Sequence, residues 1–271
     1  MPLLSERDHQ SRVRSRPAAG RRRLLILGGT GEAAALADAL SAHDNIEPIT
    51  SLAGRTAAPA APAGAVRVGG FGGVSGLLGY LRTESIDLVI DATHPFAQQI
   101  TRNATIACWS AEVPLLRLER PLWPRHPDDI WHEVSTLVDA AAAVPKFGTR
   151  AFLTVGAGEL QPFAGLPQVW FLVRLIDAPP NRLPLADYEV VLGRGPFSAA
   201  KELRLLDEQR IDVVVAKHSG GEATYGKIAA ARALGLPVIL LHRPILPPAE
   251  RPETEVGTVD EALAWVEAQL T

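Results

Sequence analysis

From residue 24 onward, short apolar runs alternate with segments of helical composition. Apolar runs bounded by glycine, proline and polar residues are typical of buried strands. In the first half of the chain they predict strands at residues 24–27, 46–51, 65–68, 88–90 and 115–118. Helices are expected at residues 32–40, 74–81, 97–109 and 134–143. Strands that alternate with helices form parallel sheets through right-handed crossovers, so this half predicts a doubly wound, Rossmann-like α/β domain.

The same alternation starts again in the second half. Strands are expected at residues 151–155, 169–175, 190–192, 213–216 and 238–241, and helices at residues 198–208, 223–234 and 259–269. A proline-containing stretch at residues 145–148 is the best candidate boundary. We therefore expect two domains with mainly parallel sheets, at residues 24–145 and 146–271. Residues 1–23 are rich in arginine and are expected to form a basic, disordered extension.

Four short matches relate the two halves. Residues 29–32 (GTGE) resemble residues 156–159 (GAGE), and residues 86–87 (ID) recur at 211–212. Residues 114–121 (PLLRLERP) resemble residues 237–244 (PVILLHRP), and residues 134–136 (VST) resemble residues 256–258 (VGT). Because the matches keep the same order, we interpret the halves as related domains. Such domains could exchange terminal elements, since each helix would fit the position of its counterpart.

Composition limits the classes of protein. The 271 residues include 27 basic and 30 acidic side chains, a net charge of −3, which gives no reason to expect a nucleic-acid partner. No run approaches the roughly 18 apolar residues of a membrane helix. The single cysteine, Cys108, offers neither an internal disulfide nor a zinc site. We expect a soluble, cytoplasmic protein without a metal centre.

The first glycine loop carries the clearest chemical signal. The pattern Gly29-x-Gly31-x-x-Ala34 follows a predicted strand and opens a predicted helix, as in dinucleotide-binding sites. Glycine permits the tight turn and the close approach of a pyrophosphate, and the helix N-terminus supplies N–H donors. Gly28, Thr30 and Glu32 are further candidates for cofactor contacts. The alternative is a strand-to-helix turn that needs glycine only for packing.

The end of the second predicted strand distinguishes the cofactors. An NAD site places an acidic residue about 20 positions after the loop, to bind the ribose 2′-hydroxyl. Residues 50–56 (TSLAGRT) contain no acid. Arg55, with the hydroxyls of Ser51 and Thr56, suits a 2′-phosphate instead. The sequence therefore favours NADPH over NADH, unless Arg55 is only a solvated loop residue.

The turn at residues 91–96 (DATHPF) follows the fourth predicted strand, where ligands of open α/β sheets bind. Thr93 is a candidate for the cofactor. His94 could donate a proton in catalysis or bind a substrate carboxylate, because its ordinary pKa lies near 6.5. The equally weighted alternative is a loop histidine that caps the next helix, with Pro95 at the helix start.

Two loops of the second half combine glycines with a cation. Residues 193–198 (GRGPFS) and 217–224 (KHSGGEAT) each follow a predicted strand and suit an anionic group. Lys227 would lie one helical turn beyond Thr224, on the same face. The alternative is that the glycines serve only backbone geometry. No Ser-His-Asp arrangement emerges.

Together these motifs resemble the precorrin-6A reductase family of cobalamin biosynthesis. The likeness runs through residues 24–37 (LLILGGTGEAAALA), 51–55 (SLAGR), 91–97 (DATHPFA), 115–121 (LLRLERP), 193–197 (GRGPF), 215–232 (VAKHSGGEATYGKIAAAR) and 236–244 (LPVILLHRP). It implies that NADPH reduces a carbon–carbon double bond of the precorrin-6A macrocycle to give precorrin-6B. Because that substrate carries many carboxylates, we expect cations and N–H-rich loops around it. The candidate substrate-binding residues are His94, Pro95, Phe96, Arg120, Arg194, Gly195, Phe197, Lys217, Ser219, Gly220, Gly221, Thr224, Lys227 and Arg243.

Two other interpretations of the function stay open. A reductase of the cobalt-containing branch would act on a metallated macrocycle and could use NADH, against which Arg55 argues. A dinucleotide-sensing protein without catalysis would explain the glycine loop but not the cationic loops. As an enzyme of the pathway, the protein could also pass its product directly to neighbouring enzymes.

Overall fold

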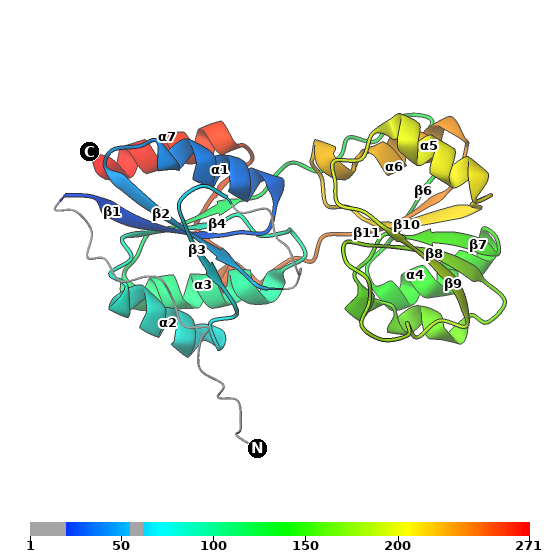
Figure 1. The fold of residues 1–271 in the computed structure, drawn as a ribbon, viewed down its shortest axis with the longest axis horizontal. Helices are drawn as coiled ribbons and strands as arrows, with labels where there is room; N and C mark the ends of the chain where they lie inside the picture. Colours follow the sequence, from blue (N-terminus) through cyan, green and yellow to red (C-terminus); the bar gives the residue numbers. More distant parts are fainter. Residues whose placement is uncertain (1–19, 55–61) are drawn as a thin grey trace, which may run out of the picture. The chain divides into compact units, whose positions relative to one another are not determined.

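The structure is a computed structural model that describes residues 20–54 and 62–271. It divides into two compact units (Figure 1). The first unit contains residues up to Glu119 and returns at Leu246–Thr271, and the second unit is Arg120–Ile245. Each unit is built on one sheet of six parallel strands. The predicted fold class, two Rossmann-like α/β domains with parallel sheets, is confirmed.

The sheet of the first unit has the order β12-β5-β4-β1-β2-β3. Its strands are β1 (Arg22–Leu27), β2 (Ile46–Leu52), β3 (Ala65–Val68), β4 (Leu88–Asp91), β5 (Leu115–Leu118) and β12 (Thr254–Val256). Its helices are α1 (Gly31–Ser41), α2 (Gly73–Thr83), α3 (Gln98–Ala111), the short η5 (Pro248–Glu250) and α7 (Val259–Leu270). Helices α1 and α7 cover one face of this sheet, and α2 and α3 cover the other (Figure 1).

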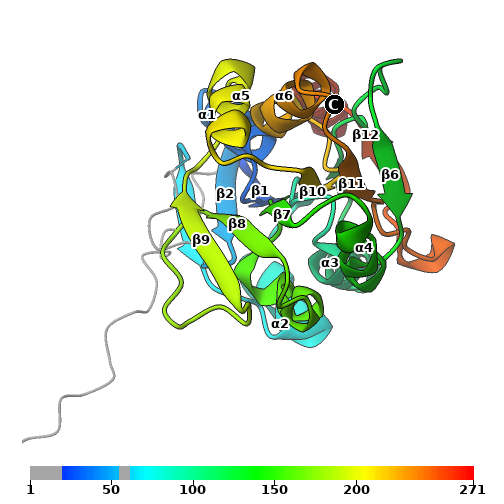
Figure 2. The ribbon, with the colours of Figure 1, turned by 90° about the vertical axis from the view of Figure 1, so that its right-hand side faces the viewer.

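The second unit repeats this topology, with the order β6-β11-β10-β7-β8-β9. Its strands are β6 (Trp131–Val134), β7 (Arg150–Leu153), β8 (Trp170–Leu175), β9 (Asp187–Leu192), β10 (Val213–Lys217) and β11 (Val238–Leu241). Its helices are α4 (Leu137–Ala143), α5 (Ala199–Glu208) and α6 (Gly226–Ala233), with short 3₁₀ turns η1 (Val144–Lys146), η2 (Ala157–Glu159), η3 (Gln161–Gly165) and η4 (Glu222–Thr224). Helices α5 and α6 lie on one face and α4 on the other (Figure 2).

The predicted boundary at 145/146 differs from the division in the structure. Strand β6, which the sequence analysis missed, pairs with β11 of the second unit, and β12 pairs with β5 of the first. The chain therefore passes between the units after β5 and again after β11, and each sheet is completed by a strand from the other half of the sequence. The exchange of terminal elements, a possibility for related domains, is observed. Both strands escaped prediction because their short sequences, WHEV and TEV, contain no apolar run.

Alternation along β1 shows how the first core is built. Successive side chains of a strand point to opposite faces. Leu24 and Ile26 pack in the cluster that includes Leu36 of α1 and Val266 of α7, whereas Leu25 and Leu27 pack in the cluster with residues of α2 and α3. Each fully buried leucine stabilises the fold by about 1.5–3 kcal/mol relative to an exposed one. The two-sided burial fixes β1 at the centre of the sheet, so the loop that follows it is held rigidly.

None of the helices in the described part of the chain is long and apolar enough to cross a membrane. Within residues 20–54 and 62–271, no group of three or more His, Cys, Asp or Glu side chains could hold a metal ion.

Candidate functional site

The glycine loop lies at the carboxyl end of β1, in the middle of the first sheet. Gly28 donates its N–H to the Ser51 carbonyl at 2.9 Å, which ties the loop to the end of β2. Thr30 caps α1: its Oγ1 accepts from the Ala33 N–H at 3.1 Å and donates to the Ala92 carbonyl at 2.8 Å. The hydroxyl of Thr30 therefore fixes the loop against the end of β4.

The glycines of this loop leave room above it. A Cβ on Gly28 would come within 3.0 Å of the Thr50 methyl group. Gly29 has a φ of +111°, a backbone conformation that residues with a side chain rarely adopt. Apart from adjoining residues of the chain and the backbone of α1, no atom of the described residues lies within 4 Å of the position that a Cβ on Gly29 or Gly31 would take. An α-helix leaves its first N–H groups without intrahelical acceptors, so the start of α1 offers donors to this space. The arrangement suits a pyrophosphate.

The end of β2 meets a cation that the sequence analysis did not single out. Ser51 is buried, and its Oγ accepts a hydrogen bond from Nη1 of Arg67 on β3 at 2.8 Å. Burial lowers the pKa of Arg67 from its ordinary value, but a guanidinium keeps its charge in proteins. The predicted phosphate ligands Arg55 and Thr56 lie outside the described residues.

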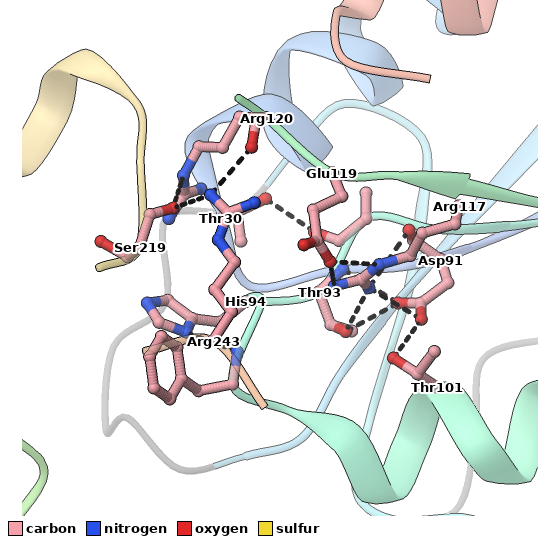
Figure 3. Close-up of polar contacts among 12 residues, drawn as sticks. Thr30, Asp91, Thr93, His94, Thr101, Arg117, Glu119, Arg120, Ser219 and Arg243 are labelled. Carbon is pink, nitrogen blue, oxygen red and sulfur yellow. Dashed lines mark hydrogen bonds and ion pairs between the residues drawn. The ribbon is translucent and has the colours of Figure 1, made fainter. Parts of the chain in front are cut away.

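A buried ion pair occupies the carboxyl end of β4 (Figure 3). Asp91 is 0% exposed, and its Oδ2 lies 2.8 Å from Nη1 of Arg117 on β5. Its Oδ1 accepts from the backbone and hydroxyl of Thr93, and Thr101 of α3 donates to Oδ2 at 2.6 Å. Glu119 binds the other side of the Arg117 guanidinium at 2.8 Å. The single guanidinium of Arg117 is therefore shared by two carboxylates.

Electrostatics keeps Arg117 charged. Burial alone lowers the pKa of Arg117, but the carboxylates of Asp91 and Glu119 outweigh it and raise the pKa above its ordinary value. Thr93 is used within the network, because its hydroxyl donates to Asp91 and accepts from Arg117 at 3.1 Å. The network fixes the backbone of the turn that follows β4.

His94 and Phe96 are carried by that turn. The Phe96 N–H donates to Nδ1 of His94 at 3.2 Å, and the two rings lie 5.7 Å apart. With Nδ1 as acceptor, the neutral imidazole carries its proton on Nε2. Pro95 is buried between them and precedes α3 by three residues. His94 is thus a polar side chain on a rigid turn, with a defined proton position.

In the second unit, a clamp of two arginines holds the loop after β10 (Figure 3). Arg120 donates from Nε to the carbonyls of Ser219 and Gly220, at 2.9 and 3.0 Å. Arg243 donates to the carbonyls of His218, Ser219 and Arg120 at 2.8–3.1 Å. Gly220 has a φ of +66°, and a Cβ there would lie 2.1 Å from the Pro121 carbonyl oxygen. The glycine is required by this close approach.

His218 is a core residue. It is 6% exposed, stacks on Trp123 with a centroid distance of 5.5 Å, and contacts the edge of Trp131. Its Nε2 lies 3.2 Å from the Trp123 carbonyl oxygen. Burial lowers its pKa, so the ring is neutral near pH 7 and its role is packing.

Two lysines of this loop region have different partners. Lys217 ends β10 and binds both carboxylate oxygens of Glu159 at 2.6 Å. Lys227, the second residue of α6, is 6% exposed and donates to the Thr224 carbonyl at 2.8 Å. Its Nζ lies 5.2 Å from the centroid of the Trp123 ring. Burial lowers the pKa of Lys227 to about 7. Its amine therefore titrates near neutral pH.

The loop at residues 193–198 meets the loop before α6. The Phe197 N–H donates to the Ala223 carbonyl at 3.0 Å, and a Cβ on Gly226 would lie 2.3 Å from the Phe197 carbonyl oxygen. The guanidinium of Arg174 lies 4.1 Å from the Phe197 ring centroid and binds Glu202 through two contacts of 2.6 and 2.8 Å. Arg194 is exposed. The two glycine-rich loops predicted from the sequence are thus side by side.

Comparison with known proteins identifies the family. The model of the precorrin-6x reductases CbiJ/CobK matches residues 23–267. The chain belongs to the precorrin-6x reductase family. It is 50% identical to the precorrin-6A reductase of Rhodococcus erythropolis over 90% of this chain and 97% of the relative. The cobalt-precorrin-6A reductase of Salmonella typhimurium is 29% identical over 82% of this chain and 87% of that one.

The fold is that of the family as well. A solved structure of the CobK precorrin-6A reductase superposes with a TM-score of 0.86 at 44% identity, covering 91% of this chain and 96% of that one. A member of the precorrin-6x reductase family is an oxidoreductase, which implies a nicotinamide dinucleotide as cofactor. The open, N–H-lined turn at Gly28–Gly31 fits the pyrophosphate of such a cofactor.

For this precorrin-6x reductase, the structure sorts the predicted site residues into two sets, at the carboxyl end of each sheet. The first unit brings together Gly28, Gly29, Thr30, Gly31, Glu32, Ser51, Thr93, His94, Pro95 and Phe96. The second brings together Arg120, Arg194, Gly195, Phe197, Lys217, Ser219, Gly220, Gly221, Thr224, Lys227 and Arg243. Their contacts with cofactor and substrate stay predictions.

Sequence reasoning missed the residues that support these sets. They are Arg67, Thr101, Arg117, Glu119, Trp123, Glu159, Arg174 and Glu202. One signal was available: a charge inside an apolar strand, as in LLRL of β5, must be paired when the strand is central. Its partner could not be named without the register between β4 and β5.

Proposed function

We propose that the protein reduces a carbon–carbon double bond of precorrin-6A to give precorrin-6B, in the corrin-ring stage of cobalamin biosynthesis, with NADPH as cofactor. The observation that carries the reaction is the 50% identity with the precorrin-6A reductase of R. erythropolis, which extends over 97% of that enzyme. The lower identity with the cobalt-precorrin enzyme of S. typhimurium, 29%, favours the metal-free substrate.

The first unit is the proposed cofactor domain. NADPH, when bound, supplies the hydride. The turn at Gly28–Gly31 and the start of α1 would hold the pyrophosphate, and Thr30 keeps that turn in place through its contact with Ala92. No acidic residue stands between Thr50 and Thr56 to bind a ribose 2′-hydroxyl, which supports NADPH rather than NADH. Arg55 keeps its predicted role at the 2′-phosphate.

His94 is the proposed proton donor. The ring donates a proton in its imidazolium form and returns to the neutral imidazole, in which Nδ1 accepts the Phe96 N–H. The Asp91–Arg117 pair supports this role by fixing the turn that carries His94. The aromatic ring of Phe96 is proposed to pack on the flat, apolar part of the macrocycle.

The second unit is the proposed domain for substrate carboxylates. Its two glycine-rich loops bring backbone N–H groups together with Arg194, Lys217 and Lys227. Arg120 and Arg243 act on the same loop by fixing the carbonyls of Ser219 and Gly220, which directs the backbone of the loop. Phe197 offers an aromatic ring beside this loop.

Turnover tests the proposal. Purified protein is mixed with precorrin-6A and NADPH, while cofactor oxidation is followed at 340 nm and the product by mass spectrometry. We expect stoichiometric oxidation of NADPH and a gain of two hydrogens in the macrocycle. Binding of NADPH without reduction would contradict the reductase function and favour a dinucleotide sensor. Faster reduction of the cobalt-containing macrocycle would contradict the assignment to the metal-free substrate.

A further inference from the structure

Arg67 lies at the edge of the first sheet where three neighbouring strands end together. Leu27 of β1 is paired in register with Ser51 of β2, and Ser51 is paired with Arg67 of β3. Strands β1, β2 and β3 are adjacent (Figure 1). Gly28, the first glycine of the loop, binds the Ser51 carbonyl. The guanidinium of Arg67 is thus one strand away from Ser51 and two strands away from the glycine loop.

This position is the one at which Rossmann sites distinguish the two nicotinamide cofactors. In such sites, a residue about 20 positions beyond the glycine loop contacts the ribose 2′ position. Ser51 stands 23 positions after Gly28 and has no carboxylate to offer. Its Oγ instead accepts a hydrogen bond from Nη1 of Arg67 at 2.8 Å. The structure therefore places a permanent positive charge where an NAD site has a negative one.

The guanidinium is rigidly held and still has donors to offer. Nη1 also donates to the Gly69 carbonyl at 2.9 Å, Nη2 donates to the Gly70 carbonyl at 3.2 Å, and the Phe71 ring stacks at 3.8 Å. These contacts use three of its five N–H groups, so two have no acceptor within the described part of the chain. A preorganised guanidinium with spare donors is suited to a phosphate, which accepts paired hydrogen bonds.

We propose that Arg67, with the hydroxyl of Ser51, binds the 2′-phosphate of NADPH and sets the preference for NADPH over NADH. The inference rests on the proposed binding of the dinucleotide to the glycine loop and adds to Arg55 a second residue that selects between the two cofactors. Arg67 contacts the phosphate only, so it is a specificity residue and takes no part in hydride transfer.

The test measures binding of four probes by isothermal titration calorimetry: NADPH, NADH, adenosine 2′,5′-bisphosphate and 5′-AMP. The variants are Arg67→Met, which removes the charge, and Arg67→Lys, which keeps it without the planar fork. Arg82→Met is the matched control, because Arg82 is an exposed arginine on α2 of the same unit. Circular dichroism and thermal melting confirm that each variant is folded.

We expect Arg67→Met to weaken NADPH and adenosine 2′,5′-bisphosphate by about tenfold or more, since charged hydrogen bonds are lost. Affinities for NADH and 5′-AMP should stay within about threefold, and Arg67→Lys should keep part of the preference. Arg82→Met should leave all four affinities unchanged.

Two results would overturn the inference. Equal losses for all four probes in Arg67→Met would show that Arg67 only orders the loop at Gly69 and Gly70, and an unchanged preference would show that another residue reads the phosphate. If Arg67→Met does not fold, the same criteria apply to Arg67→Lys. In that variant, an unchanged affinity for adenosine 2′,5′-bisphosphate and an unchanged preference for it over 5′-AMP would contradict binding of the phosphate by the planar guanidinium of Arg67. Wild-type protein that binds none of the four probes would contradict the proposed cofactor domain itself.

Discussion

The two units share one strand order, yet the glycine turn after the first central strand leads to different structures. After β1, residues 29–32 lead directly into α1, a helix of 11 residues capped by Thr30. After β7, the matching residues 156–159 contain a 3₁₀ turn of 3 residues, Ala157–Glu159. There the Glu159 carboxylate accepts the Gly156 N–H at 2.8 Å and also binds Lys217. Because Glu159 itself takes up the Gly156 N–H, this donor is not available to a phosphate, so the turn of the first unit is the one suited to a dinucleotide.

The second difference between the units lies in the pair of strands β4 and β5 and in their counterparts β10 and β11. In the first unit, Asp91 and Arg117 are paired in register on β4 and β5. At the matching positions of the second unit, the register pairs Ala216 with Leu240. The same fold therefore accepts either a buried ion pair or two apolar residues at this place. The charged version occurs in the unit whose turn carries His94, and we infer that it was kept for rigidity of that turn rather than for stability alone.

The largest expected effect comes from breaking this ion pair. Arg117→Leu leaves Asp91 buried without its cation, which should lower the free energy of unfolding by about 3–5 kcal/mol. The double variant Asp91→Ala/Arg117→Leu copies the second unit and should recover most of that loss. Urea denaturation followed by circular dichroism measures both. A double variant as unstable as the single one would show that the first unit cannot accept the apolar arrangement.

The pH dependence of stability separates the buried cations of the two units. The pKa of Lys227 is lowered to about 7 by burial, whereas the unfolded lysine titrates near 10.5. Between these values the unfolded state binds the additional proton, so this group makes the protein more stable as pH rises from about 7 to 10.5. Its contribution should change by about 1.4 kcal/mol for each pH unit in that range. Below about pH 7 the penalty of the buried charge is complete and constant.

Lys227→Met should therefore stabilise the protein most at pH 7 and progressively less by pH 9. Thermal or urea denaturation of the variant and the wild type at both values gives the difference. Arg117, whose pKa is raised, keeps its charge throughout this range and supplies the contrast. A stability difference between Lys227→Met and wild type that does not change with pH would contradict the lowered pKa.

The contrast between the units also shows what the sequence could reveal. The glycine turns, the apolar central strands and the parallel topology were predictable, because the strands are buried on both faces and read as apolar runs. The division into units was not, because, of the strands that define it, β6 has a single buried position and β12 has none. Four ordered matches between the halves did indicate the related domains, whereas the exchange of terminal elements was only a possibility that related domains allow.

The residues of the candidate site also divide into those that the sequence could reveal and those that it could not. Residues placed by local spacing, such as Thr30 and His94, could be named from the chain alone. Arg67 could not, because its relation to Ser51 depends on the register between β2 and β3, and Arg117 depends in the same way on β4. Likewise, the carboxylate that binds Lys217 comes from a loop 58 residues away. Charges that act across strands are visible only once the strands are aligned.

The smallest expected effect tests the glycine turns directly. Thr30 of the first turn corresponds to Ala157 of the second, so Thr30→Ala makes the first turn resemble the one that opens no α-helix. Loss of a threonine cap costs about 1 kcal/mol of stability. Thr258→Ala, which removes the cap of α7 in the same unit, should cost a similar amount and serves as the control.

Only Thr30→Ala should also weaken NADPH, by a few fold, because the Thr30 hydroxyl additionally ties the glycine turn to the Ala92 carbonyl at the end of β4. Calorimetric titration of both variants with NADPH measures the difference, and thermal denaturation confirms that their stabilities match. Equal affinities in the two variants would mean that the turn keeps its shape without the hydroxyl. The glycines and the start of α1 would then be sufficient to distinguish the first turn from the second.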